Sequence, residues 1–151
     1  MKATDLLKRQ HKEVKSLFKK LESTDNARMR RQLMTEIARA LEGHTAIEEE
    51  IFYPAVREVE SQKAEEMVLE AYEEHHVVKL VLAELPQVNP EDERFEAKMT
   101  VLSELVEHHV EEEEKEMFKL AQKLGKDELE ELGEQMEERF EALRGRAAEA
   151  A

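Results

Sequence analysis

Two copies of the pattern His-x-x-x-Glu each place an imidazole and a carboxylate where they can act together. His44 precedes Glu48 in "HTAIEEEIFYP", and His109 precedes Glu113 in "HHVEEEE". Residues four apart share one face of a helix, and both pairs continue stripes of apolar residues that should face a core. A buried carboxylate costs several kcal/mol unless a cation or another partner offsets its lost hydration. The pattern therefore indicates a buried site for metal ions.

An internal repeat relates these two pairs and adds one histidine to each. The segment "HKEVKSLFKKL", which begins at His11, aligns with "HHVVKLVLAEL", which begins at His75, at an offset of 64 residues. The His44 pair aligns with the His109 pair at an offset of 65 residues. A helical hairpin followed by its copy, packed face to face, predicts a bundle with an approximate two-fold axis, in which each half offers a lone histidine and one His-x-x-x-Glu.

The repeat predicts a bundle interior that holds four imidazoles and two carboxylates. The candidate metal ligands are His11, His44, Glu48, His75, His109 and Glu113. Neutral imidazole and carboxylate suit iron, manganese, zinc or cobalt. Two carboxylates on the pseudo-two-fold axis can bridge two metals, with two imidazoles completing each. Iron or manganese is our first expectation, and zinc is chemically allowed.

Helical periodicity defines the elements that must position these residues. We expect helices over about Thr4–Leu21, from the turn at Ser23–Asn26 to about Glu58, and over about Gln62–Leu85. A fourth helix follows the loop Pro86–Asp92 and ends at Gly125, and a fifth amphipathic segment follows it. Pro54 predicts a kink or an early end in the second helix.

These elements predict an all-α fold, an antiparallel up-and-down four-helix bundle with an extra C-terminal helix. We expect the bundle to occupy residues 1–122, with residues 123–151 forming an amphipathic helix and tail packed on the same domain. The fifth helix can serve either a monomer or a homodimer.

Composition restricts the classes of partner. The chain has 151 residues and a net charge of -14, which argues against nucleic acid and anionic membranes as partners. It has no cysteine, hence no thiolate ligand and no disulfide. We find neither a secretory signal nor the ~18 apolar residues of a membrane span, so we expect a cytoplasmic protein.

The order lone His, His-x-x-x-Glu, lone His, His-x-x-x-Glu resembles the hemerythrin-like (HHE cation-binding) domain over roughly His11 to Leu120. The resemblance implies a four-helix bundle that holds two iron ions without porphyrin, joined by an oxo or hydroxo bridge. It also implies that the six candidate residues are ligands, with Glu48 and Glu113 bridging.

The sequence departs from the invertebrate oxygen carriers of that family in two places. They have two histidines four apart on the third helix, but the positions four either side of His75 are Ala71 and Lys79. They also space the last histidine and its acid by five, a spacing that fits His108 with Glu113, so His108 can replace or join His109 as a ligand. A site with fewer ligands has more open positions, which favours reactivity over reversible oxygen storage.

Several neighbouring residues have competing interpretations. His76 and Tyr53 are candidates for additional ligands or for residues that support the ligands, although Tyr53 can equally be plain packing. Glu49 and Glu112 belong to acidic runs and are expected to face solvent. Ferritin-like bundles need Glu-x-x-His on two helices, and the single match that begins at Glu73 has no repeat partner.

Three functions follow from these observations. The leading hypothesis is a non-haem di-iron protein that binds or reacts with a small oxidant, such as dioxygen, peroxide or nitric oxide. The alternative is a non-catalytic module that senses iron or oxygen, or buffers metal, with the same ligands. The third is a purely structural acidic bundle, which predicts no metal.

Overall fold

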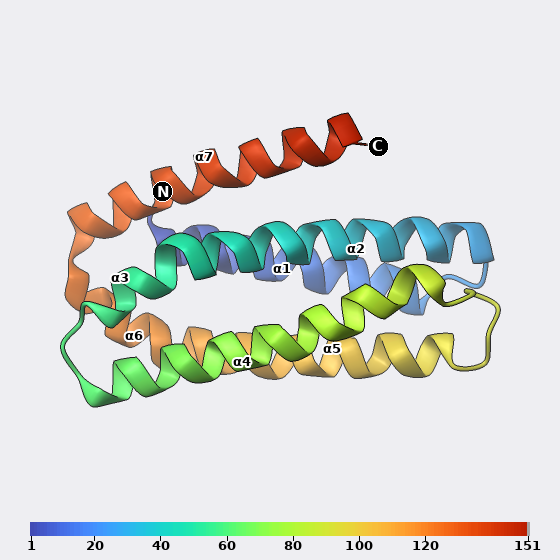
Figure 1. The fold of residues 1–151 in the computed structure, drawn as a ribbon, viewed down its shortest axis with the longest axis horizontal. Coiled ribbons are helices and arrows are strands. Elements are labelled where there is room, and N and C mark those ends of the chain that lie inside the picture. Colours follow the sequence, from blue (N-terminus) through green and yellow to red (C-terminus); the bar gives the residue numbers. More distant parts are fainter. Residues whose placement is uncertain (151) are drawn as a thin grey trace.

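The computed structural model describes the backbone of residues 1–150 and the side chains of residues 1–146. Within that range four long helical rods run antiparallel and a fifth helix lies across them, as predicted (Figure 1). The long helices are α1 (Ala3–Glu22), α2 (Ala27–Ile47), α4 (Gln62–Glu84), α5 (Phe95–Glu112) and α7 (Lys126–Ala150). The shorter pieces are η1 (Glu48–Phe52), α3 (Tyr53–Arg57), η2 (Leu85–Gln87), η3 (Glu113–Met117), α6 (Phe118–Ala121) and η4 (Gln122–Leu124).

Local sequence signals set the ends of several rods. The Asn26 side chain accepts a hydrogen bond from the backbone N–H of Met29 at the start of α2, and Ser61 accepts one from Ala64 at the start of α4. Both are helix-capping residues that satisfy free N–H groups of the first turn. Gly125 adopts φ +90° after η4, a conformation that favours glycine, and ends the fourth rod where the sequence predicts.

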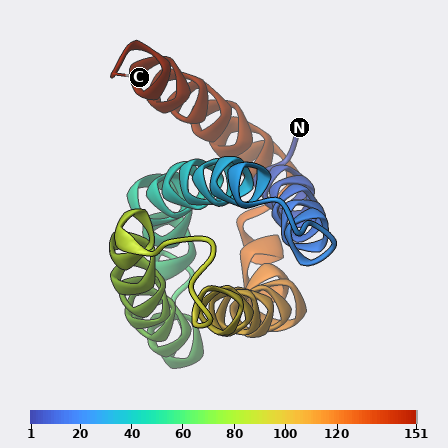
Figure 2. The ribbon, with the colours of Figure 1, turned by 90° about the vertical axis from the view of Figure 1, so that its right-hand side faces the viewer.

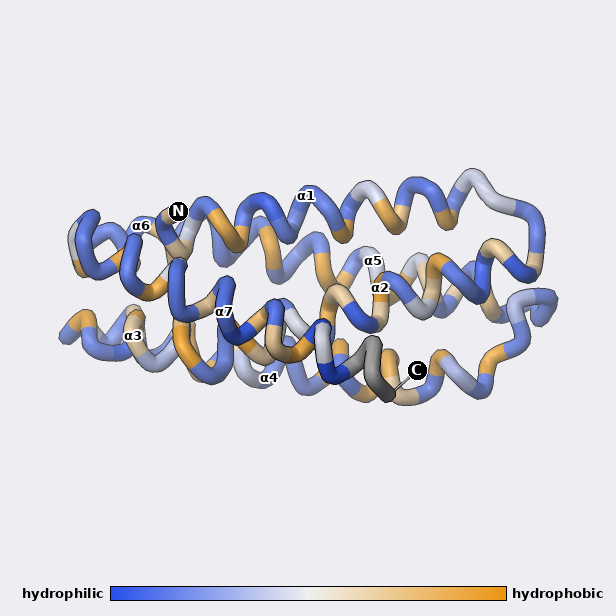
Figure 3. The backbone as a smooth tube through the Cα atoms, turned by 90° about the horizontal axis from the view of Figure 1, so that it is seen from above, coloured by the Kyte–Doolittle hydropathy of each residue, from blue (hydrophilic) through white to orange (hydrophobic). Residues whose placement is uncertain are grey.

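The core consists of two apolar clusters, with a polar layer between them. The first cluster includes Leu7, Ile47 and Ala71, and the second includes Val14, Leu41 and Val78. Each of the helices α1, α2 and α4 passes from one cluster to the other through a histidine, so the titratable side chains lie mid-bundle. The apolar positions face inward along the rods (Figure 3), which agrees with the stripes in the sequence.

Helix α7 lies outside the four-rod ring, across α1 and α2, and diverges from it toward the C-terminal end (Figures 1 and 2). It approaches the chain start so closely at Gly133 that a Cβ there would clash with the backbone of Met1 and Ala3. The Arg139 guanidinium of α7 donates to the Glu50 carboxylate of η1 at 2.8 and 3.3 Å. None of the helices among the described residues is long and apolar enough to cross a membrane.

The second rod changes its helical geometry just before Pro54. The rod passes through the π-helical turn η1 and continues as α3, with Pro54 in the first turn of α3. A proline is tolerated there because its missing N–H is not needed by the new helix. The fourth rod has the same π-turn, η3, without any proline. The π-turns therefore accompany the two repeated glutamates rather than the proline.

Candidate metal centre

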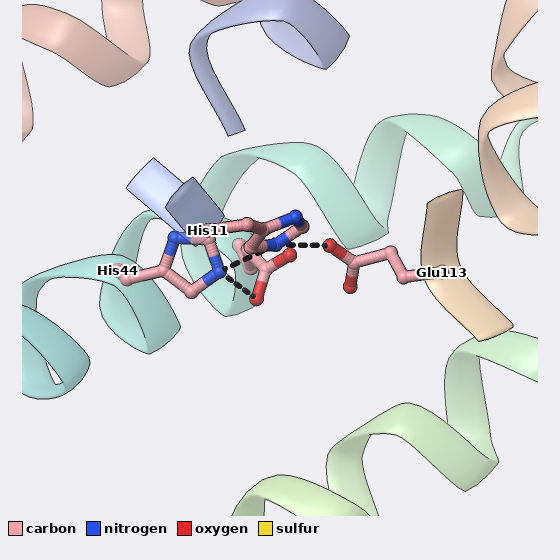
Figure 4. Close-up of side chains that lie close together, drawn as sticks. His11, His44 and Glu113 are labelled. Atoms are coloured by element: carbon pink, nitrogen blue, oxygen red, sulfur yellow. Dashed lines mark hydrogen bonds and ion pairs between the residues drawn. The ribbon is translucent and has the colours of Figure 1, made fainter. Parts of the chain in front are cut away.

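The structure brings together six of the predicted side chains from all four rods. They are His11 on α1, His44 on α2, Glu48 on η1, His75 on α4, His109 on α5 and Glu113 on η3, all buried. The histidines form two pairs, because the Nε2 atoms of His11 and His44 lie 3.2 Å apart, as do those of His75 and His109. Figure 4 shows His11, His44 and Glu113 pointing toward one another.

Each carboxylate spans both histidine pairs. Glu48 Oε1 lies 3.1 Å from Nε2 of His44 and 3.1 Å from Nε2 of His75. Glu113 reaches His109 through Oε2 at 3.1 Å and His11 through Oε1 at 3.3 Å. Two carboxylates that each touch both pairs have the arrangement that bridging between two ions requires.

Three carboxylate oxygens at the centre lack the partners that burial demands. Within residues 1–146, Glu48 Oε1, Glu48 Oε2 and Glu113 Oε1 are buried without a hydrogen bond. An unsatisfied buried group of this kind costs about 1–3 kcal/mol, and more when charged. Candidate ligand atoms of His11, His44, Glu48 and Glu113 lie within 4.8 Å of one another, and so do those of Glu48, His75 and His109. The residues present therefore fit a pair of cations.

A second layer of oxygens fixes the orientation of all four imidazoles. In each histidine, Nε2 faces the centre and Nδ1 contacts an oxygen behind it. The pairs and their distances are His11 with Glu114 (2.7 Å), His44 with Gln10 (2.7 Å), His75 with Glu49 (2.9 Å) and His109 with Glu74 (2.8 Å). An acceptor behind Nδ1 holds the proton there, and this leaves the Nε2 lone pair available to a metal.

The sequence reasoning missed this second layer. It expected Glu49 to face solvent, but Glu49 is half-buried because it lies behind His75 and also contacts Lys79 Nζ at 2.7 Å. The repeat contains the signal. Glu49 and Glu114 each follow a central glutamate, and Gln10 and Glu74 each precede a lone histidine.

The remaining sequence candidates fall in two different environments. Tyr53 is buried and donates a hydrogen bond to Glu113 Oε2 at 2.7 Å, with its hydroxyl also close to His75 and His109. His108 is 68% exposed and lies 3.9 Å from Glu74. His76 is exposed. The structure thus brings Tyr53 to the cluster and leaves His108 and His76 on the surface.

Crowding of charge at the centre shifts several pKa values in the metal-free protein. Burial, assisted by the Glu113 charge, raises the pKa of Glu48 to about 8. Burial and the charges of His11 and His109 lower the pKa of His44 to about 3. Burial lowers the pKa of His109, but its contacts with Glu113 and Glu74 outweigh burial, and the pKa rises. Burial raises the pKa of Glu113, but its contacts with Glu48, His109 and His11 outweigh burial, and the pKa falls.

We expect the metal-free protein to lose stability as the pH rises from 6.5 to 8. Folded Glu48 then binds a proton that the unfolded chain has already released, and the raised pKa of His109 acts in the same direction. Folded His44 is neutral throughout this window, but unfolded His44 still releases protons just above pH 6.5, and this opposes a small part of the loss. The expected loss in the free energy of unfolding is about 2 kcal/mol. Urea unfolding followed by circular dichroism measures it, and a flat or rising profile contradicts it.

A small cavity adjoins the four imidazoles on an otherwise apolar wall. Its volume is about 20 Å³, and its lining is His11, Val14, Leu41, His44, Thr45, His75, Val78, Val106, His109 and Val110. A groove of about 830 Å³ lined by residues of α1, α5 and η3 shares four of these residues, His11, Val14, Val106 and Val110. The cavity is just large enough for one water-sized molecule, and the four shared residues place the groove next to it.

Comparison with known families agrees with this geometry. The model of the hemerythrin HHE cation-binding domain matches residues 2–121. The crystal structure of a hemerythrin HHE cation-binding domain-containing protein from Mycobacterium kansasii superposes with a TM-score of 0.85 at 30% identity. The match covers 98% of this chain and 90% of that one.

Curated relatives share the sequence over different extents. An uncharacterized protein of Mycobacterium tuberculosis is 32% identical over 148 residues, 96% of this chain and 89% of its own length. A protein of Nostoc sp. described as a DNA nickase is 28% identical over 118 residues, 78% of this chain. The match spans only 33% of the length of that Nostoc protein.

Proposed function

Because this chain belongs to the hemerythrin HHE cation-binding domain family, we propose that it holds two iron ions and binds or reacts with a small oxidant such as dioxygen, peroxide or nitric oxide. The observation that carries the proposal is the pair of buried carboxylates, each in contact with both histidine pairs and left with unpartnered oxygens. One ion would lie between His11 and His44 and the other between His75 and His109, with Glu48 and Glu113 shared.

The proposed iron pair would supply redox equivalents, and the protein's own residues would control access and protons. Val14, Val106 and Val110 border both the groove and the cavity, and we expect small molecules to enter between them. Tyr53 keeps a proton on its hydroxyl, because burial and the Glu113 charge raise its pKa well above the usual value. The hydroxyl oxygen that carries this proton lies 2.7 Å from Glu113 Oε2 and within 3.2 Å of Nε2 of His75 and His109.

Peroxide is the substrate that can be tested without a further reagent. In disproportionation, one peroxide is oxidised to dioxygen and releases two electrons and two protons, and a second peroxide takes them up to give two water molecules. No other reductant is consumed. Release of dioxygen from added peroxide therefore distinguishes turnover from simple binding.

The test is to purify the protein without chelator or affinity metal, then quantify metal and record the visible spectrum. Roughly two irons per chain, with charge-transfer bands in the near-ultraviolet, is the expected result for a dinuclear site of imidazole and carboxylate. Zinc or a single metal contradicts the oxidant chemistry. Absence of metal, together with unchanged stability on chelation, contradicts the whole proposal.

A non-catalytic sensing role is the second candidate, and one contact favours it. Arg139 of α7 pairs with Glu50, which lies two residues beyond Glu48 on the same π-turn. A change of state at Glu48 can therefore reach α7 on the outside of the bundle. Metal binding without dioxygen release from peroxide, combined with altered proteolysis of α7 on oxidation, would support sensing over turnover.

We expect Val106→Phe to slow the entry of peroxide into the loaded protein. Val106 borders both the groove and the cavity, so a larger side chain narrows the passage. A barrier increase of about 1.4 kcal/mol gives a roughly tenfold slower absorbance change in stopped flow. Val101→Phe is the matched control, because Val101 lies on the same helix and is 50% exposed. Equal rates for Val106→Phe and wild type would rule out this route.

A further inference from the structure

The two halves of the centre have the same ligands but different groups behind them. Under the repeat, the pair His44 and Gln10 corresponds to His109 and Glu74. His44 Nδ1 lies 2.7 Å from the Gln10 amide oxygen, and His109 Nδ1 lies 2.8 Å from the Glu74 carboxylate. The oxygen behind Nδ1 thus lies at a similar distance in both halves, but it is charged only behind His109.

The other two imidazoles differ in the opposite direction, because Glu49 has a lysine beside it and, among residues 1–146, Glu114 has none within 4.0 Å. His11 and His75 both have a carboxylate behind them, Glu114 and Glu49. Lys79 partly neutralises Glu49, at 2.7 Å. Glu74 keeps its charge, because among residues 1–146 no lysine or arginine lies within 4.0 Å of it. The strongest contrast between the halves is therefore Gln10 against Glu74.

A tyrosine hydroxyl near His75 is a second difference between the two halves. Tyr53 places its hydroxyl 3.1 Å from Nε2 of His75. Phe118, its counterpart under the repeat, stacks on His11 with ring centroids 6.2 Å apart and offers no polar atom. The His75 and His109 half thus has a buried hydroxyl that the His11 and His44 half lacks.

A carboxylate behind Nδ1 increases the electron-donating strength of the imidazole, and loss of such a partner typically costs a metal site about 10–100-fold in affinity. A neutral amide orients the ring but adds no charge. From this contrast we propose that the two metal positions are inequivalent. The position at His75 and His109 fills first, and Gln10 keeps the position at His11 and His44 the weaker one. This inference rests on the proposed two-metal function.

The test exchanges the two groups without changing side-chain size. Metal-free wild type, Gln10→Glu, Glu74→Gln and the double variant are titrated anaerobically with cobalt(II) in competition with a chromophoric chelator. Wild type should show two steps separated by about tenfold or more. Gln10→Glu should tighten the weaker step, and Glu74→Gln should weaken the tighter one, each by about tenfold.

The double variant gives the sharpest outcome, because it should reverse the order of filling. Anomalous scattering from crystals loaded with one equivalent of cobalt should locate the ion at His75 and His109 in wild type. In the double variant it should locate the ion at His11 and His44. Glu104→Gln, an exposed change on α5, should behave as wild type.

The outcomes separate this inference from the proposed function. If no variant binds two metals, the two-metal function itself is wrong. If wild type binds two metals in one indistinguishable step, or the exchange leaves the order of filling unchanged, only the inequivalence is wrong. Glu74→Gln keeps the same shape and a hydrogen-bonding oxygen, so it still gives a readout if Gln10→Glu fails to fold.

Discussion

Glu48→Gln is expected to change stability in opposite directions in the metal-free and the metal-loaded protein. In the metal-free state, burial and Glu113 raise the pKa of Glu48 to about 8. Keeping this carboxyl neutral near pH 7 therefore costs free energy that a glutamine does not incur. We expect metal-free Glu48→Gln to be more stable than metal-free wild type by about 3 kcal/mol.

In the metal-loaded state, we expect Glu48→Gln to be less stable than wild type. A glutamine has one neutral acceptor and cannot bridge two cations, so metal content should fall from about two ions per chain to fewer than one. Wild type should unfold more than about 10 °C higher with metal than after chelation, because ligands that bind only the folded state stabilise it. Glu48→Gln should lose most of that difference.

Calorimetric scans of both proteins, before and after chelation, measure all four states. Glu111→Gln is the matched control, since it makes the same Glu-to-Gln change at an exposed position on α5, outside the six central residues. A metal-free Glu48→Gln variant that is less stable than wild type near pH 7 would contradict the account of the buried carboxylates. Retention of two metals by the variant would show that Glu48 does not bridge.

The second large effect is expected on replacement of His109, but not on replacement of its neighbour His108. His109→Asn removes the Nε2 atom that lies 3.1 Å from Glu113 and 3.2 Å from His75 Nε2. We expect its metal content to fall to about one ion per chain or less, because loss of a supporting residue alone costs about 10–100-fold in affinity and loss of a ligand costs more. His108→Asn changes a side chain that is 68% exposed, and should keep the wild-type content.

Elemental analysis and the near-ultraviolet spectrum of the two variants decide between the alternatives that the sequence leaves open. The spacing of five from His108 to Glu113 and the spacing of four from His109 are both compatible with a ligand. The helix geometry turns only His109 inward. Loss of metal from His108→Asn, with retention in His109→Asn, would reverse this assignment.

Helical periodicity and the internal repeat were enough to predict the main architecture and to nominate the six central residues. Apolar stripes through Leu41, Val14 and Val78 predict helices with the correct inward faces. The family resemblance is confirmed by the match over residues 2–121. The four histidines are buried because they occupy positions in the apolar stripes, and these stripes face the centre of the bundle.

Tertiary contacts explain what the sequence did not predict. Glu49 lies in an acidic run that resembles a solvated surface, and its role depends on His75 approaching from another rod. Gln10 and Glu74 lie beside histidines in the chain but support histidines of neighbouring helices. The π-turns could not be predicted from the sequence either, because "EEEIF" and "EEKEM" have ordinary helical composition.

The π-turns also carry information about ancestry. Each contains one residue more than an α-helical turn, and they occupy equivalent places in the two repeats, at Glu48–Phe52 and Glu113–Met117. The simplest history is a single one-residue insertion that preceded gene duplication. The ancestral hairpin would then have supplied half of the centre, and two identical copies would have completed it. In such an ancestor, metal binding and chain association would have been one and the same event.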